Sequence, residues 1–209
     1  MRTLLLLSAF LLFSTTSYCQ IKAITDSGEE VFLYDDGSWK YTHVSEKILN
    51  EIKTNPKKFN KSDHATFLVK SKKFNIGFWL DPKKWKFEKA IHNPDAEYEL
   101  ELKGDDLYGM IISEKVEIPL DVLKEVALDN GRATAPDLHI VQQEYRVVNG
   151  LKVLLLQMNG SLQGIKFSYY GYYFSNPNGT VQFITYTSQN LLNNYREEIE
   201  ELLNGLVEL

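Results

Sequence analysis

The sequence predicts an α+β fold, in which an antiparallel sheet is sandwiched by helices and preceded by a small three-stranded β-meander. Three observations carry this prediction. Short runs of β-forming residues recur along the 209-residue chain and are separated by Asp-Gly and Asn-Gly turns. Two segments, 119–130 and 189–206, carry apolar residues at helical spacing. Hydrophobic residues make up 44% of the chain and charged residues 24%, which is enough apolar material for a packed core.

The first 19 residues have the layout of a cleaved secretory signal. Arg2 precedes an apolar run over 4–13 that is too short to span a bilayer, and small or polar residues close the segment at Cys19. We therefore predict a signal peptide over 1–19, a mature chain that begins at Gln20, and a periplasmic or secreted location. In the alternative interpretation Cys19 is lipidated and anchors the chain, although Tyr18 departs from the usual lipoprotein pattern.

Charge and cysteine content narrow the class of protein. The formal net charge is −5, which disfavours nucleic acid and anionic membrane surfaces as partners. Cys19 is the only cysteine, so a chain cleaved after it has no disulfide, and its stability must come from apolar burial. Export without cysteine is typical of a bacterial envelope protein.

Residues 20–44 are predicted to form the β-meander. Turn signals at 26–28 and 35–37 separate three short β-rich runs, and glycine accepts the positive φ of such tight turns. Three short strands bury little surface, so we expect the meander to pack on another surface. Residues 45–65 are predicted to be a linker that contains a short helix candidate over 45–53, because Asn55-Pro56 and several lysines follow it.

Residues 66–209 are predicted to form the α+β domain. Pro119 begins one helix and Gly131 ends it, and a second helix over 189–206 closes the chain. Asn149-Gly150 and the turn at 176–179 make the last strands consecutive hairpins. The strands are expected at 66–69, 74–80, 86–90, 96–102, 107–113, 140–148, 151–158, 165–174 and 180–187.

Three segments of this domain stand out: FNIGFWLDPKKW, NGLKVLLLQMNG and GIKFSYYGYYFSNPNGTVQFITYTSQNLLNNYREEIEELLNGL. Together they resemble the Mog1/PsbP-like family over residues 66–209. The resemblance implies an antiparallel sheet between helices and a role in docking to other proteins, and it carries over no catalytic residue. The front segment DDGSWKY resembles a short β-rich motif at the mature start of other exported bacterial proteins.

The aromatic run on the strand 165–174 is the candidate binding surface. Strand alternation places Tyr170 and Tyr172 on one face, and Tyr169 and Tyr173 on the other. In one interpretation one set packs under a helix and the other reaches the surface. In the functional interpretation exposed tyrosines form a docking face for a protein or a glycan, joined by Trp39.

The sequence contains no nucleophile elbow, no phosphate-binding loop and no Cys/His metal spacing. Asp137 and His139 share a face of an extended segment, and would act as a catalytic pair only with a hydroxyl nearby. The pairs at 35–36 and 105–106 are interpreted as turn residues rather than calcium ligands. We expect no metal and no cofactor.

The sequence thus predicts an exported, non-enzymatic protein of the bacterial envelope that binds a protein partner. The alternative is a module that binds a glycan or small molecule in a groove between helix and sheet. A hydrolase is the third hypothesis. Neither nucleic-acid binding nor a membrane span in the mature chain is expected.

Overall fold

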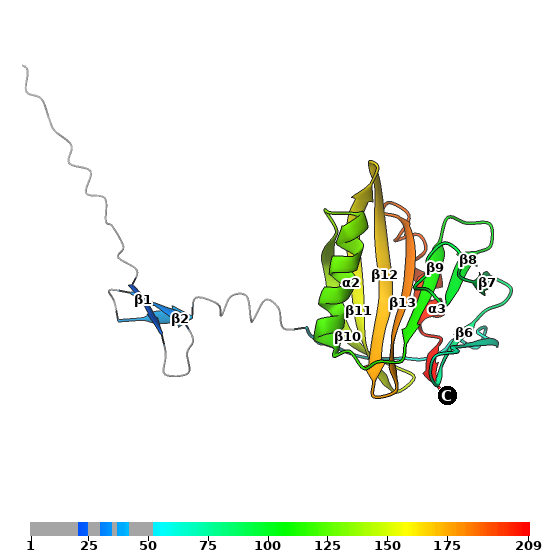
Figure 1. Ribbon diagram of the computed structural model, residues 1–209, viewed down its shortest axis with the longest axis horizontal. Coiled ribbons are helices and arrows are strands. Elements are labelled where there is room, and N and C mark those ends of the chain that lie inside the picture. Colours follow the sequence, from blue (N-terminus) through cyan, green and yellow to red (C-terminus); the bar gives the residue numbers. More distant parts are fainter. Residues whose placement is uncertain (1–20, 25–29, 35–36, 42–51) are drawn as a thin grey trace, which may run out of the picture. The chain divides into compact units, whose positions relative to one another are not determined.

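The computed structural model describes residues 21–24, 30–34, 37–41 and 52–209, which belong to two units divided after residue 51 (Figure 1). In the first unit three strands pair in the order β1-β2-β3, as the antiparallel meander that the sequence predicts. They are β1 (Ile21–Ile24), β2 (Glu30–Leu33) and β3 (Trp39–Tyr41). The predicted signal peptide with Cys19 and Gln20, and most of the helix candidate at 45–53, lie outside the described residues.

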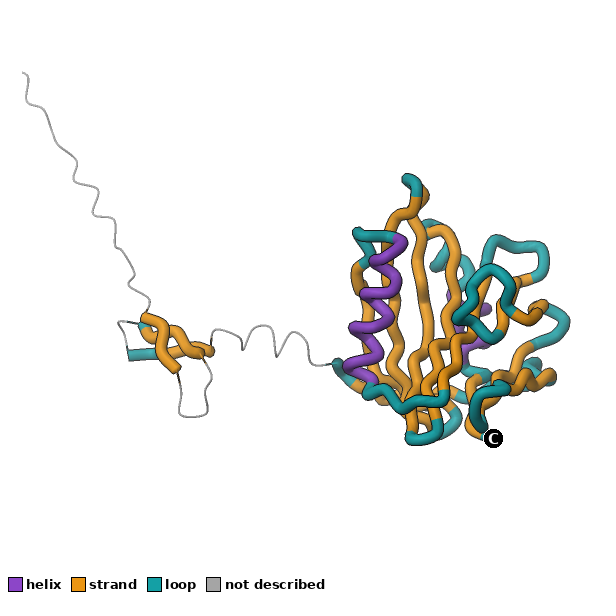
Figure 2. The backbone as a smooth tube through the Cα atoms, viewed as in Figure 1, coloured by secondary structure: helices purple, strands orange, loops and turns teal. Residues whose placement is uncertain are grey.

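The second unit is built on an eight-stranded sheet in the order β4-β10-β11-β12-β13-β9-β8-β7 (Figure 2). Every strand expected after residue 66 is present, within a few residues of its predicted bounds. The strands of this sheet are β4 (Thr54–Phe59), β7 (Trp85–Lys89), β8 (Tyr98–Leu102), β9 (Tyr108–Glu114), β10 (His139–Val148), β11 (Leu151–Leu162), β12 (Ile165–Asn176) and β13 (Gly179–Ser188).

The prediction of a linker over 45–65 is wrong for residues 54–59, which form the edge strand β4. β4 pairs in parallel with β10, so the sheet is mixed and not antiparallel throughout. Pro56 and the neighbouring lysines suggested a linker, but an edge strand accepts proline because one side of its backbone has no partner strand. Phe59 ends the strand and is buried, which anchors it to the core.

Different layers cover the two faces of the sheet. Helix α2 (Leu120–Thr134) packs on one face against Leu154 and Leu156. The other face, with Val153 and Leu155, is covered by helix α3 (Arg196–Leu203) and by a second sheet in the order β14-β6-β5. The second sheet consists of β5 (Phe67–Lys70), β6 (Ile76–Leu80) and β14 (Leu206–Glu208). The sequence predicts a helix on each face but not this second sheet.

The closing helix is shorter than the predicted range of 189–206. Residues 189–195 form turns, and the chain leaves α3 at Gly205 to pair with β6. Gly205 accepts a hydrogen bond from the Trp79 N–H at 2.8 Å, and a Cβ on Gly205 would lie 1.8 Å from the Trp79 carbonyl oxygen. Glycine is therefore required where α3 passes into β14, because no side chain fits between the two backbones.

We predict that Gly205→Ala lowers the free energy of unfolding by about 3 kcal/mol or more, because the overlap is with backbone that cannot rotate away. Gly104→Ala is the matched control. Gly104 has a positive φ of 87° but nothing within 4 Å of its Cβ position, so only the backbone strain of about 1 kcal/mol is expected. Urea unfolding followed by circular dichroism measures both. Equal losses would contradict the close approach of β14 to β6.

Candidate functional site

The tyrosines predicted to form a docking face are mostly buried. Tyr170, Tyr172 and Tyr173 are 1%, 0% and 0% exposed, so the prediction that they form a docking face is wrong. The reason is that β12 is an interior strand of a sheet that is covered on both faces. Tyr169 is half-buried and lines a groove described below. Trp39 lies in β3, and its side chain is outside the described residues.

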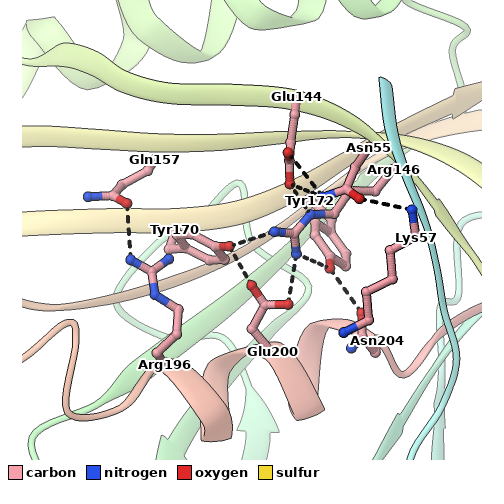
Figure 3. Close-up of polar contacts among 10 residues, drawn as sticks. All are labelled: Asn55, Lys57, Glu144, Arg146, Gln157, Tyr170, Tyr172, Arg196, Glu200 and Asn204. Carbon is pink, nitrogen blue, oxygen red and sulfur yellow. Dashed lines mark hydrogen bonds and ion pairs between the residues drawn. The ribbon is translucent and has the colours of Figure 1, made fainter. Parts of the chain in front are cut away.

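Tyr170 and Tyr172 belong to a polar network around Arg146, which is 5% exposed (Figure 3). One guanidinium nitrogen of Arg146 donates to the Tyr172 hydroxyl at 2.9 Å and to a Glu200 carboxylate oxygen at 2.8 Å. The other terminal nitrogen donates to the Tyr170 hydroxyl at 3.2 Å, and Arg146 Nε donates to Glu144. The network therefore joins β10, β12 and α3.

The hydroxyls of Tyr170 and Tyr172 also donate hydrogen bonds to other groups. Tyr170 donates to Glu200 at 2.6 Å, and Tyr172 donates to the Asn204 side-chain oxygen at 2.9 Å. Burial and the bond to Glu200 raise the pKa of Tyr170 to about 12. Burial alone would lower the pKa of Arg146, but the two tyrosines and Glu144 more than offset this and raise it. The guanidinium is therefore permanently charged, and it is paired with carboxylates on both sides.

Two further contacts connect the network to the edge of the sheet. The Arg146 guanidinium stacks on the Phe59 ring, 4.4 Å from its centroid. The Asn55 amide donates to both oxygens of Glu144 at 3.2 Å. Both partners lie in β4, so the same arginine that holds α3 also holds the edge strand. The hydrogen bonds described for the Arg146 guanidinium all go to groups of this network, which Figure 3 shows as the dashed lines around it.

A second feature, on the α2 face, is accessible. We call it the aromatic row, and it consists of Phe167, Tyr169, Tyr186 and Tyr108. Cross-strand register places Tyr169 opposite Tyr186 and Tyr186 opposite Tyr108. Ring centroids are 5.0 Å apart for Phe167 and Tyr169, 6.1 Å for Tyr169 and Tyr186, and 5.6 Å for Tyr186 and Tyr108. The row thus crosses three adjacent strands.

The aromatic row lines a groove of ≈ 340 Å³ beside the C-terminal end of α2. The helix side of the groove presents small side chains, at Gly131, Thr134 and Ala135, which leave the rings accessible. The hairpin between β11 and β12 contributes Leu162 and Ile165, which are 44% and 66% exposed. Polar lining residues are Asp106, Gln163 and Ser188, together with Thr187, which is buried and donates its hydroxyl to the Asp106 backbone oxygen. An apolar floor with a few polar groups is the usual composition of a small-ligand site.

Sequence reasoning identified Tyr169 but missed the rest of the aromatic row. Alternation within one strand tells which face a ring is on, but only the register between strands shows which rings meet. The available signal was an aromatic residue near the same end of three strands, at Tyr108, Tyr169 and Tyr186.

The Asp137 and His139 pair does not form a catalytic triad with a hydroxyl. The Ser161 hydroxyl donates to the Asp137 carboxylate at 2.6 Å, and the Ser161 N–H donates to the same carboxylate at 2.9 Å. These bonds lower the pKa of Asp137. The His139 ring contacts the Asp137 backbone oxygen and not the serine, so the Ser-His-Asp order of a catalytic triad is not formed.

Within the described ranges, no group of three or more His, Cys, Asp or Glu side chains converges as a metal site would require. Asp105 lies in the turn after β8, where its carboxylate accepts a hydrogen bond from the Tyr195 hydroxyl at 3.2 Å. The pair at 35–36 lies outside the described residues. None of the helices that the structure describes is long and apolar enough to cross a membrane.

No protein-family model and no curated protein matches the sequence. Solved structures match in shape. The cyanobacterial PsbP protein CyanoP from Synechocystis sp. PCC 6803 aligns with a TM-score of 0.53 and 13% identity, over 71% of this chain and 95% of its own. A protein of unknown function from Pseudomonas aeruginosa aligns with a TM-score of 0.44 and 10% identity, over 68% and 96%. The CyanoP alignment shows the PsbP-like fold that the resemblance implied.

LpqN from Mycobacterium tuberculosis is described as a protein involved in cell envelope biogenesis. It aligns with a TM-score of 0.41 and 10% identity, over 73% of this chain and 98% of its own. At these identities the likeness concerns the fold alone.

We predict that Arg146→Met lowers the free energy of unfolding by about 3–5 kcal/mol, because it leaves Glu144 and Glu200 without their buried cation. Arg196→Met is the matched control. Arg196 stacks on Tyr170 with 4.4 Å to the ring centroid but is half-buried, so a loss of about 1 kcal/mol is expected. Chemical denaturation measures both losses. A small loss for Arg146→Met would show that the network is not what holds α3.

Loss of the hydroxyl should change the free energy of unfolding differently at two buried tyrosines of the same strand. The Tyr173 hydroxyl is buried without a hydrogen-bond partner among the described residues, whereas the Tyr170 hydroxyl is bonded to Arg146 and Glu200. Tyr173→Phe should leave the free energy of unfolding unchanged or raise it by up to about 1 kcal/mol, and Tyr170→Phe should lower it by about 1–2 kcal/mol. Thermal and urea unfolding test this, and equal effects would contradict the assignment of the network.

Proposed function

We propose that this chain is an exported, non-enzymatic binding module of the bacterial envelope, and that the groove beside α2 holds its ligand. The carrying observation is the aromatic row at the floor of that groove, with Tyr108 37% exposed at one end. The ligand class that fits is a small molecule or glycan with a flat apolar face, because flat rings stack on it and the rim offers hydroxyl and carboxylate groups.

The leader over 1–19 supports export, through the order of its basic, apolar and small residues. The non-enzymatic assignment is supported by the Asp137 geometry, in which the His139 ring contacts the Asp137 backbone oxygen and not the Ser161 hydroxyl, so the two do not form a triad. A protein partner, the first hypothesis from the sequence, loses its support from Tyr170, Tyr172 and Tyr173 because these rings are buried. The alternative hypothesis, a ligand bound in a groove between helix and sheet, gains support from the groove beside α2.

We predict that ligands binding here act through Tyr186, at the centre of the aromatic row. The test is an NMR titration of the labelled protein with neutral oligosaccharides and with a set of aromatic fragments. Chemical shift changes should map to the groove, and Tyr186→Ala should weaken binding at least about tenfold.

Tyr145→Ala is the control, because Tyr145 is a half-buried tyrosine of the same sheet that does not line the groove. Binding should survive this substitution. Shift changes confined to another surface, or the absence of binding by either set of probes, would contradict the proposal.

A further inference from the structure

The strand β7 is the free edge of the eight-stranded sheet, since its one partner in the described sheet is β8. Positions 84 and 90, on either side of β7, are hydrogen-bonded to positions 103 and 97. Because hydrogen-bonded positions alternate along an antiparallel ladder, the backbone groups of the even-numbered positions of β7 face β8. The backbone N–H and C=O of Phe87 therefore point outward and are available to another strand.

The sequence of this edge is complementary to itself. β7 reads Trp-Lys-Phe-Glu-Lys, with Phe87 at its centre. When two copies pair in antiparallel fashion around Phe87, each Lys86 lies directly opposite Glu88 of the other copy. The outward-facing backbone of Phe87 is also what this arrangement requires, because the central residue then exchanges both of its hydrogen bonds with its own counterpart. Charge pattern and backbone orientation agree on one register.

Glu88 lacks a partner that a second copy would supply, whereas Lys86 is already paired with Glu101 at 3.1 Å and would bridge both carboxylates. Glu88 is exposed, lies opposite Glu99 in the β7–β8 ladder, and has no ion pair with any described residue. Lys86 from a second copy would provide its cation. On the other face of the strand, Phe87 is 38% exposed and Phe67 is 43% exposed, with ring centroids 5.2 Å apart. Two copies would bring these rings together.

An opening of ≈ 790 Å³ runs along this edge, with Phe67 and Phe87 on one face of the sheet and Lys86 and Glu88 on the other. It reaches both faces because the sheet ends here, so it is a free strand edge and not a closed ligand pocket. Exposed strand edges are protected in single-chain proteins by charge or cover. Here Lys86 and Glu88 are placed so that each would lie opposite the other residue of a second copy.

From these observations we propose that the protein forms a two-fold symmetric dimer, in which β7 of two copies pair around Phe87 and join the two sheets. The contact is isologous: the same patch on each copy meets itself, so the assembly closes at two copies. Lys86 and Glu88 make two equivalent ion pairs across the axis, and the phenylalanines form one apolar cluster on the face opposite to them.

A charge exchange on the purified protein tests this. Wild type should show a monomer–dimer equilibrium in sedimentation velocity that shifts with concentration. Lys86→Glu and Glu88→Lys each place like charges opposite one another twice, so each should raise the dimer Kd at least about tenfold. The double variant recreates the matching pairs and should recover the wild-type Kd. Lys115→Glu changes the charge equally at an exposed turn away from β7 and should have no effect.

Hydrogen exchange gives a second readout that needs no substitution. The Phe87 amide should exchange more slowly as protein concentration rises, because its N–H becomes bonded in the dimer. A wild-type protein that stays monomeric at millimolar concentration overturns the proposal. So does a double variant that associates no better than the single variants, since that outcome places any self-association on another surface.

Discussion

The buried charge of Arg146 is the constraint on which the second unit depends. A guanidinium that is 5% exposed is tolerated only when its donors are bonded and its charge is balanced. Those partners come from separate parts of the chain: Glu144 beside it on β10, two tyrosines on β12, and Glu200 on α3. Arg146 and its direct partners therefore link the edge strand β4, α3 and the centre of the sheet in one network.

The division of β12 into two faces follows from this constraint. Tyr170 and Tyr172 point toward Arg146, so their hydroxyls serve the network and are closed to any ligand. Tyr169 and Tyr173 point to the α2 face. There α2 covers Tyr173 completely, and its C-terminal end leaves Tyr169 at the groove. Tyr173 is thus buried and Tyr169 lines the groove because α2 ends between them.

Local signals in the sequence were sufficient for the strands joined by hairpins, but not for β4 or β14. Asn149 and Gly150 have φ values of 48° and 88°, the pair of positive angles that an Asn-Gly hairpin turn requires. Contacts between segments far apart in the chain could not be predicted from such local signals. The strand β4 resembles a linker in the sequence because Pro56 is typical of both. Its pairing with β10, and the contacts of Phe59 and Asn55 with β10 residues, place it in the sheet. The closing helix ends before the predicted residue 206 because the chain turns at Gly205 to pair with β6. The helical spacing of apolar residues gives no sign of this turn.

The groove and the β7 edge are neighbours, and this links the two proposals. Tyr108 and Tyr186 line both the groove beside α2 and the opening along β7. Tyr108 lies opposite Glu101, and Glu101 is opposite and bonded to Lys86, the residue proposed to cross the dimer axis. A ligand on the aromatic row would therefore contact β9, which is separated from the pairing edge β7 by β8 alone. Any dependence of ligand affinity on dimer formation would be carried by this short path of cross-strand pairs and would be reciprocal, because coupling between two binding equilibria acts equally in both directions.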